Sequence, residues 1–189
     1  MFNKFIENFL TIDECDYLIS LGKSIELKKM QSSIVKNGKL VENFIEYSGN
    51  KRTGGYFTNE LLDNPIVKSM SNNIISLSNV LKPCKGIDYT KIKYYSFNQY
   101  SVDDSLNWHA DSHEILEGAT ITFILQLNDN YDGGDVKYII NEIEYKLPKK
   151  TGSVFVFDSQ ILHSVSNVES GFRYSLNVWP SSKKIISLL

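Results

Sequence analysis

Short apolar segments separated by turn residues fill the second half of the chain. Five such segments are rich in β-branched and aromatic residues: 91–95, 119–127, 135–140, 153–157 and 173–179. Runs of this length and composition, bounded by Gly, Asn and Asp, predict β-strands. A succession of short strands favours a sandwich, jelly roll or barrel over an open parallel sheet.

The first half predicts two helices. Thr11 with Glu14 three residues on is the pattern of a capping box, and the apolar run after it is expected to end near Gly22. A second helix is expected to begin at Pro65, which suits a first turn. Beyond Pro65, apolar side chains recur at three- and four-residue spacings: Ile66, Met70, Ile74 and Leu77.

These elements predict one domain covering residues 1–189, in which residues 1–88 support a β core at 89–180. Hydrophobic residues make up 42% of the chain, enough for a folded globular protein. The net charge is −2 with no basic run, so nucleic-acid binding is not indicated. No stretch approaches the roughly 20 apolar residues of a membrane span, and nothing in the sequence fixes an oligomeric state.

A cytoplasmic location is expected from the N-terminal segment and the cysteines. Glu7 interrupts what would be the apolar part of a signal peptide, and no small-residue cleavage site follows. Cys15 and Cys84 lie far apart and match no metal or redox pattern. We therefore predict that both are small core residues in a reducing compartment.

Candidate metal ligands come from a chain with only three histidines. His109 and Asp111 are two residues apart, so on an extended segment both side chains point to one face. His163 follows the apolar segment 153–157, and a β-barrel can return it to the same mouth. Two imidazoles and one carboxylate on one face of an octahedron leave three positions open, which is typical of non-haem Fe(II) enzymes.

Two other interpretations of these residues stay open. A His-x-Asp triplet by itself is compatible with a solvated loop. On a helix, His109 and His113 could share a zinc ion with Glu114 nearby. Asp111 and Ser112 are poor helix formers, and no Glu lies between the two histidines at the position a zinc protease needs, so the zinc interpretation is disfavoured.

Arg173 adds a candidate anion site ten residues after His163. Ser175 lies two residues further on the same predicted strand and hence on the same face. A guanidinium inside a barrel needs an anion, and its planar fork matches a carboxylate. Arg173 and Ser175 could therefore grip one end of a dicarboxylic co-substrate, unless Arg173 is an ordinary strand residue with an exposed head.

Taken together, these residues resemble the 2-oxoglutarate-dependent dioxygenases of the prolyl 4-hydroxylase-like family. The parts of the chain that carry the resemblance are, in order, 12–15, 51–54, Tyr95 with 98–100, His109-x-Asp111, 131–135, His163, and 171–176 with Trp179. The resemblance implies a double-stranded β-helix, a distorted, cupin-like jelly roll with flanking helices. It also implies Fe(II), 2-oxoglutarate and O2, with ascorbate as reductant, and hydroxylation of a C–H bond coupled to release of succinate and CO2.

The same resemblance implies roles for further residues. His109, Asp111 and His163 correspond to the metal ligands, and Arg173 with Ser175 to the 2-oxoglutarate site. Two further candidates for that site are Tyr95 and Gln126. Alternation from Ile92 places Tyr94, rather than Tyr95, on the core side, so both tyrosines stay candidates. Trp108 and Trp179 are expected to be packing residues.

Four features depart from the family pattern. Asn98 replaces a glycine, residues 102–106 are an insertion before the His-x-Asp motif, Asn167 stands where proline is common, and Gln126 stands where a tyrosine often helps to bind 2-oxoglutarate. None of them is a metal ligand. They bear on the co-substrate contacts and on the substrate.

The substrate class is the most open part of the prediction. The resemblance favours an amino-acid side chain in a protein or peptide, with proline first. The same chemistry on a free amino acid, another small molecule or a nucleobase is an alternative. A different class of function is a metal- or sugar-binding jelly roll without catalysis.

Overall fold

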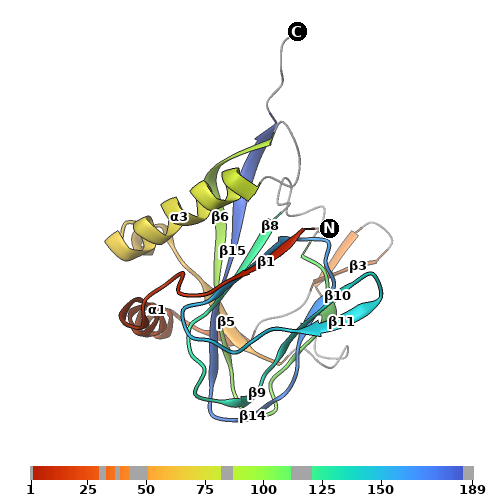
Figure 1. The fold of residues 1–189 in the computed structure, drawn as a ribbon. Helices are drawn as coiled ribbons and strands as arrows, with labels where there is room; N and C mark the ends of the chain where they lie inside the picture. The colour runs from red at the N-terminus through yellow and green to blue at the C-terminus, as the bar shows by residue number, and fades with distance from the viewer. Residues whose placement is uncertain are drawn as a thin grey trace.

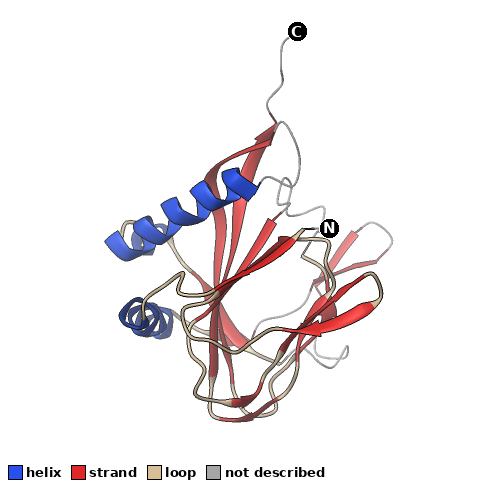
Figure 2. Ribbon diagram, in the orientation of Figure 1, coloured by secondary structure: helices blue, strands red, loops and turns tan. Residues whose placement is uncertain are grey.

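The computed structural model describes residues 2–29, 33–36, 39–42, 51–81, 87–111 and 121–184. Two antiparallel β-sheets face each other, and the helices lie on the outer face of the larger sheet (Figures 1 and 2). The mainly β architecture with flanking helices that the sequence predicts is confirmed. Cys84 and His113 lie outside the described residues, and the division at residue 88 stays a prediction.

The larger sheet supplies most of the framework. Its seven strands lie in the order β1 (Asn3–Ile6), β12 (Val154–Asp158), β8 (Ile121–Gln126), β15 (Arg173–Lys184), β6 (Ile87–Tyr100), β5 (Thr53–Tyr56) and β2 (Lys28–Lys29). The strands β6 and β15 are longer than the segments predicted at 91–95 and 173–179. They pair from Tyr100 with Arg173 to Ile87 with Lys184. The register of this pairing shifts twice, between Trp179 and Pro180 and between Ser181 and Ser182, and these shifts leave Lys93 and Thr90 of β6 without a Cα partner.

The smaller sheet closes the other side. Its strands lie in the order β11 (Ile143–Lys146), β10 (Val136–Ile140), β13 (His163–Val165) and β7 (Leu106–His109). Two further two-stranded pairs are β14 (Val168–Ser170) with β9 (Asp132–Gly133), and β3 (Ser33–Lys36) with β4 (Lys39–Glu42). Every pairing between these strands is antiparallel.

Three helices are described: α1 (Ile12–Ser24), α2 (Asn59–Leu62) and α3 (Pro65–Leu81). The capping box is confirmed, because Thr11 Oγ1 accepts from Glu14 N at 3.2 Å and Glu14 Oε2 accepts from Thr11 N at 2.8 Å. The predicted end near Gly22 is two residues early. A Cβ at Gly22 would lie 2.3 Å from the Phe97 ring, so this glycine permits close packing of α1 on the sheet instead of ending the helix.

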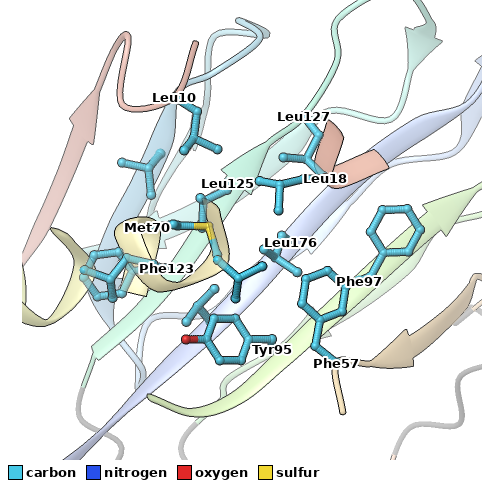
Figure 3. Packing of buried hydrophobic residues seen from close by; sticks show 14 of the residues in the cluster. Leu10, Leu18, Phe57, Met70, Tyr95, Phe97, Phe123, Leu125, Leu127 and Leu176 are labelled. Atoms are coloured by element: carbon cyan, nitrogen blue, oxygen red, sulfur yellow. The ribbon is translucent and has the colours of Figure 1, made fainter. Parts of the chain in front are cut away.

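Strand alternation creates two separate apolar clusters. The first lies between the helices and the larger sheet; its labelled members in Figure 3 are Leu10, Leu18, Phe57, Met70, Tyr95, Phe97, Phe123, Leu125, Leu127 and Leu176. Cys15 belongs to it, as predicted. The second lies between the two sheets and joins Ile124 and Phe155 to Val136 and Val165. The space between the sheets is where the candidate site lies. None of the helices in the described ranges has the length and apolar character needed to cross a bilayer.

Candidate metal centre and co-substrate site

The three predicted metal ligands meet between the sheets. Strand β7 pairs with β13 so that His109 lies opposite His163, and Asp111 follows β7 by two residues. His109 Nε2 is 3.5 Å from Asp111 Oδ1, and His163 Nε2 is 3.7 Å from Asp111 Oδ2. One ligand atom from each residue lies within 4.8 Å of the other two. Among the described residues, no other group of His, Cys, Asp and Glu meets this condition.

Main-chain carbonyls orient both imidazoles. His109 Nδ1 lies 2.8 Å from Asn107 O, and His163 Nδ1 lies 3.0 Å from Ile161 O. A carbonyl can only accept, so both Nδ1 atoms carry the proton and both Nε2 atoms offer a lone pair. His163 Nε2 is buried and has no hydrogen-bond partner in the described part of the chain. An orphaned acceptor beside a carboxylate and a second imidazole fits a divalent metal ion.

Asp111 is held through one of its two oxygens. Thr122 Oγ1 donates to Oδ2 at 2.9 Å and Trp179 Nε1 donates to the same oxygen at 3.3 Å. Thr122 Oγ1 is also 3.0 Å from Ser159 Oγ, and Asp111 N donates to Ser159 O at 2.9 Å. The other oxygen, Oδ1, is left facing His109. These contacts fix the carboxylate while keeping an oxygen available for a metal.

Trp179 and Thr122 are thus site residues that the sequence interpretation missed. Trp179 was expected only to pack. Strand alternation could have indicated both residues, because residues an even number of positions apart share one face of a strand. Trp179 is six residues after Arg173 on one strand, and Thr122 is four residues before Gln126 on another.

The electrostatics favour the ligating forms of these groups. Burial by itself raises the pKa of Asp111, but the neighbouring His163 and His109 and the Thr122 hydrogen bond hold it below the usual range of an aspartate. Burial lowers the pKa of His163 to about 4, although Asp111 opposes this shift. The positive charge of Arg52 also contributes to the lowering. At neutral pH the site therefore offers a carboxylate and a neutral imidazole.

Arg173 is buried on the inner face of β15, with 1% of its surface exposed. Its Nη1 donates to Ser175 Oγ at 3.1 Å, its Nη2 donates to Gln126 Oε1 at 3.3 Å, and its guanidinium lies 5.0 Å from the centre of the Tyr100 ring. Its Nε has no partner, and no ion pair of Arg173 is found among the described residues. A buried guanidinium surrounded by neutral groups is matched to an external anion.

Gln126 is oriented by its own network. Its Nε2 donates to Asn128 O at 2.6 Å and to the Tyr131 hydroxyl at 2.7 Å. The amide oxygen is therefore turned toward Arg173. Gln126 lies at the Arg173 end of the site, where the sequence interpretation expected it, and holds the guanidinium.

The structure corrects the assignment of Tyr95 to the co-substrate site. Tyr95 is buried in the cluster under the helices, where it stacks on Phe57 at 6.1 Å and its hydroxyl contacts Ser71 of α3. It pairs with Val178, whose side chain also faces the helices. Tyr95 therefore points away from Arg173, because adjacent residues of a strand face opposite sides. Tyr94, which pairs with Trp179, lies on the inner-face side and is 40% exposed.

A second guanidinium, that of Arg52, reaches the inner face from the start of β5. Arg52 Nε donates to Asn98 Oδ1 at 2.9 Å. Asn98 pairs with Ser175, so its side chain shares the inner face with Arg173. Asn98 also contacts Ser96, which pairs with Asn177. The inner face of β6 and β15 is consequently lined by polar side chains, with Arg52 beside it.

Comparison with known proteins gives these observations a context. Residues 95–181 match the model of the 2OG-Fe(II) oxygenase superfamily. A PKHD-type hydroxylase of Acinetobacter baumannii is 30% identical over 99 residues, which cover 46% of this chain and 42% of the relative. The match thus spans less than half the length of that curated relative.

Solved structures match over most of the chain. A prolyl-4-hydroxylase of Pseudomonas putida superposes with a TM-score of 0.73 at 16% identity, covering 95% of this chain and 91% of that one. A Trichoplax adhaerens prolyl hydroxylase, solved with a peptide fragment of the hypoxia inducible factor oxygen degradation domain, gives a TM-score of 0.73 at 18% identity, covering 95% and 83%. The double-stranded β-helix predicted from the sequence is confirmed.

Proposed function

We propose, on the premise that residues 95–181 of this chain belong to the 2OG-Fe(II) oxygenase superfamily, that the protein is an Fe(II)- and 2-oxoglutarate-dependent dioxygenase. Its reaction is hydroxylation of a C–H bond with conversion of 2-oxoglutarate and O2 to succinate and CO2. The observation that carries the proposal is the orphaned, buried Nε2 of His163 beside Asp111 and His109.

In this proposal, His109, Asp111 and His163 hold the iron. With two imidazoles and one carboxylate as its protein ligands, the iron would have positions left for 2-oxoglutarate and O2. When bound, Fe(II) supplies the redox chemistry that O2 needs to attack a C–H bond. The chain's own part is to hold the carboxylate of Asp111 through Thr122 and Trp179, to keep both imidazoles in the ligating tautomer, and to exclude water from a buried site.

The co-substrate contacts follow from Arg173. Among the described residues, its Nε has no partner, and its Nη1 and Nη2 donate hydrogen bonds only to the neutral side chains of Ser175 and Gln126. The far carboxylate of 2-oxoglutarate can replace these weak contacts with a bidentate, charge-assisted pair. Ser175 then donates its hydroxyl to the same carboxylate. His109, Asp111 and His163 would hold the metal to which the other end of 2-oxoglutarate would bind.

A prolyl or other amino-acid residue in a peptide or protein is the proposed substrate. Support comes from the relatives, among them prolyl hydroxylases and one structure that contains a bound peptide fragment. Ascorbate is the proposed reductant that restores Fe(II) when the metal is oxidised without hydroxylation. A cytoplasmic location remains an expectation from the sequence.

Succinate formation tests the proposal. Purified protein receives Fe(II), ascorbate, air and 2-oxoglutarate, with and without a panel of proline-containing peptides. Succinate is expected from the wild type and is expected to fall to background in His109→Ala. Arg173→Lys, which keeps the charge but loses the planar fork, is expected to need more 2-oxoglutarate for half-maximal rate.

A separate binding measurement gives a result even if the peptide panel does not contain the substrate. 2-Oxoglutarate bound to Fe(II) under argon gives a visible charge-transfer absorption, which needs no turnover. If the wild type gives no succinate and no such absorption, the dioxygenase proposal is excluded. A non-catalytic metal- or sugar-binding jelly roll then remains.

A further inference from the structure

Arg52 carries an unused donor inside the site. Its Nη1 is buried and has no hydrogen-bond partner in the part of the chain that the structure describes, while its Nε donates to Asn98 Oδ1 at 2.9 Å. No ion pair of Arg52 is found within the described ranges. Leaving a guanidinium donor buried and unpaired is costly, so such an atom points to a ligand that completes it.

The position of Arg52 sets where this ligand lies. Gly54 and Tyr56 of β5 pair with Asn98 and Ser96 of β6, and Arg52 is on the same face of β5 by alternation. Arg52 Nε donates to Asn98 Oδ1 at 2.9 Å, and Asn98 shares the inner face with Arg173 because it pairs with Ser175. Arg52 therefore faces the chamber of the metal ligands from the β5 side, separated from Arg173 by the intervening strand β6.

Asn98 explains how this guanidinium is held in place. The amide oxygen of Asn98 accepts from Arg52, and its nitrogen donates to Ser96 O at 3.0 Å. The family that the sequence resembles has glycine at this position, and a glycine offers no side-chain acceptor. With Nε donating to Asn98, the buried Nη1 is the donor of Arg52 that is left without a partner in the described part of the chain.

We propose that Arg52 is a substrate-recognition residue that binds a carboxylate group of the substrate, so that this enzyme selects a substrate bearing a carboxylate next to the residue it hydroxylates. The inference rests on the proposed function and names the substrate class of that same site. The co-substrate does not fill this role, since Arg173 with Ser175 and Gln126 already forms a complete site for its far carboxylate.

A carboxylate fits better than a more highly charged group. The planar edge of a guanidinium matches the two oxygens of a carboxylate. The neighbouring inner-face residues Asn98 and Ser96 are neutral, so a single positive charge is available for a monoanion. The carboxylate can come from an Asp or Glu side chain or from the C-terminus of a peptide, and these two sources are distinguished by experiment.

Three blocked peptides serve as probes: acetyl-Ala-Pro-Glu-amide, acetyl-Ala-Pro-Gln-amide and acetyl-Ala-Pro with a free C-terminus. Their affinities are measured by calorimetry on protein loaded with Zn2+ and 2-oxoglutarate, which does not turn over. The variants are Arg52→Gln, Arg52→Lys and Asn98→Gly. Lys51→Gln is the matched control, because it removes the same charge from an exposed neighbouring side chain.

The wild type and Lys51→Gln are expected to bind a carboxylate peptide roughly tenfold to a hundredfold more tightly than the Gln peptide. Whether the Glu peptide or the free C-terminus gains more identifies the source of the carboxylate. In Arg52→Gln the preference for the carboxylate peptide over the Gln peptide is expected to shrink to less than twofold. Arg52→Lys keeps the charge and is expected to retain part of the preference, and Asn98→Gly is expected to weaken it without removing it.

Equal affinity for all three peptides in the wild type overturns the inference, as does a preference that survives in Arg52→Gln. Failure of the proposed function appears elsewhere, as an absence of succinate and of the 2-oxoglutarate absorption in the wild type. The two failures are therefore separable.

Discussion

Replacement of Thr122 by valine tests how Asp111 is held. Valine has nearly the same shape as threonine, and Thr122 is fully buried, so the change removes the hydroxyl with little change in packing. The hydroxyl donates to Asp111 Oδ2 at 2.9 Å, while Trp179 Nε1 donates to the same oxygen at 3.3 Å. Thr122→Val therefore leaves the carboxylate with the longer of its two hydrogen bonds.

The structure sets the size of the expected effect. A hydrogen bond to a charged group contributes about 1.5–3 kcal/mol, and loss of a partner of a metal ligand typically lowers metal affinity about 10–100-fold. These ranges agree, since tenfold corresponds to about 1.4 kcal/mol. Because Trp179 still donates to Oδ2, we expect Thr122→Val at the lower end, near tenfold. The double variant with Trp179→Phe is expected to approach hundredfold.

The assay is competition for Co(II) or Mn(II) against a chromophoric chelator, with circular dichroism to check that each variant is folded. Ser159→Ala is the matched control. Its hydroxyl contacts Thr122 at 3.0 Å, whereas its carbonyl, which accepts from Asp111 N, remains. Ser159→Ala is expected to change metal affinity less than about threefold, because the hydrogen bonds to the Asp111 side chain stay in place. Wild-type affinity in Thr122→Val, or an equal loss in Ser159→Ala, would refute the argument.

Three further predictions concern other parts of the molecule. Replacing Arg173 by Met is expected to raise the 2-oxoglutarate concentration for half-maximal succinate formation roughly hundredfold or more, since two charge-assisted bonds of about 1.5–3 kcal/mol each are lost; a change below threefold contradicts the assignment. Tyr95→Phe removes the contact with Ser71, so urea unfolding should show a loss of about 1 kcal/mol with the 2-oxoglutarate requirement unchanged. Burial raises the pKa of the Cys15 thiol to about 11 from 9.0, so the thiol stays protonated through that range; in a Cys84→Ser background, Ellman's reagent at pH 8 should react about a hundredfold more slowly with native than with urea-unfolded protein.

Sequence patterns predict this fold well in segments whose structure follows from a single local feature, such as a capping box or a regular apolar spacing. The capping box at Thr11 and Glu14 has its own residue code, and the apolar spacing after Pro65 matches a helix face that buries Met70 and Ile74. The two-residue spacing from His109 to Asp111 places both side chains at one site. These are local rules, and each holds without knowledge of the partner strand.

Tyr95 shows why the side-chain direction in β6 was harder to predict. Tyr94 and Tyr95 are adjacent in the sequence and both aromatic, so hydrophobicity does not tell which of them faces the helices. The register with β15 decides the matter, because Val178 opposite Tyr95 faces the helices. That pairing joins segments far apart in the sequence. Motif resemblance favoured Tyr95, and the long-range register overruled it.

Arg52 was difficult for a related reason. It precedes the four-residue strand β5, whose sequence, Thr53 to Tyr56, contains two glycines and no apolar alternation. Its hydrophobic pattern does not indicate that this segment lies between β6 and β2 in the larger sheet. The orphaned Nη1 becomes visible only once β5 is paired.

The two faces of β15 separate the requirements of stability from those of chemistry. Tyr174, Leu176 and Val178 face the helices and belong to the apolar cluster, whereas Arg173, Ser175 and Asn177 face the chamber between the sheets and are equally buried. Burial of polar groups without full hydrogen bonding is unfavourable, and Arg173 Nε and Asn177 Oδ1 both lack partners within the described structure. Apolar side chains at these inner positions would pack the two sheets at lower cost. Their polarity is therefore best explained by the molecules that the chamber binds, and the opposite face of the same strand supplies the stability that offsets it.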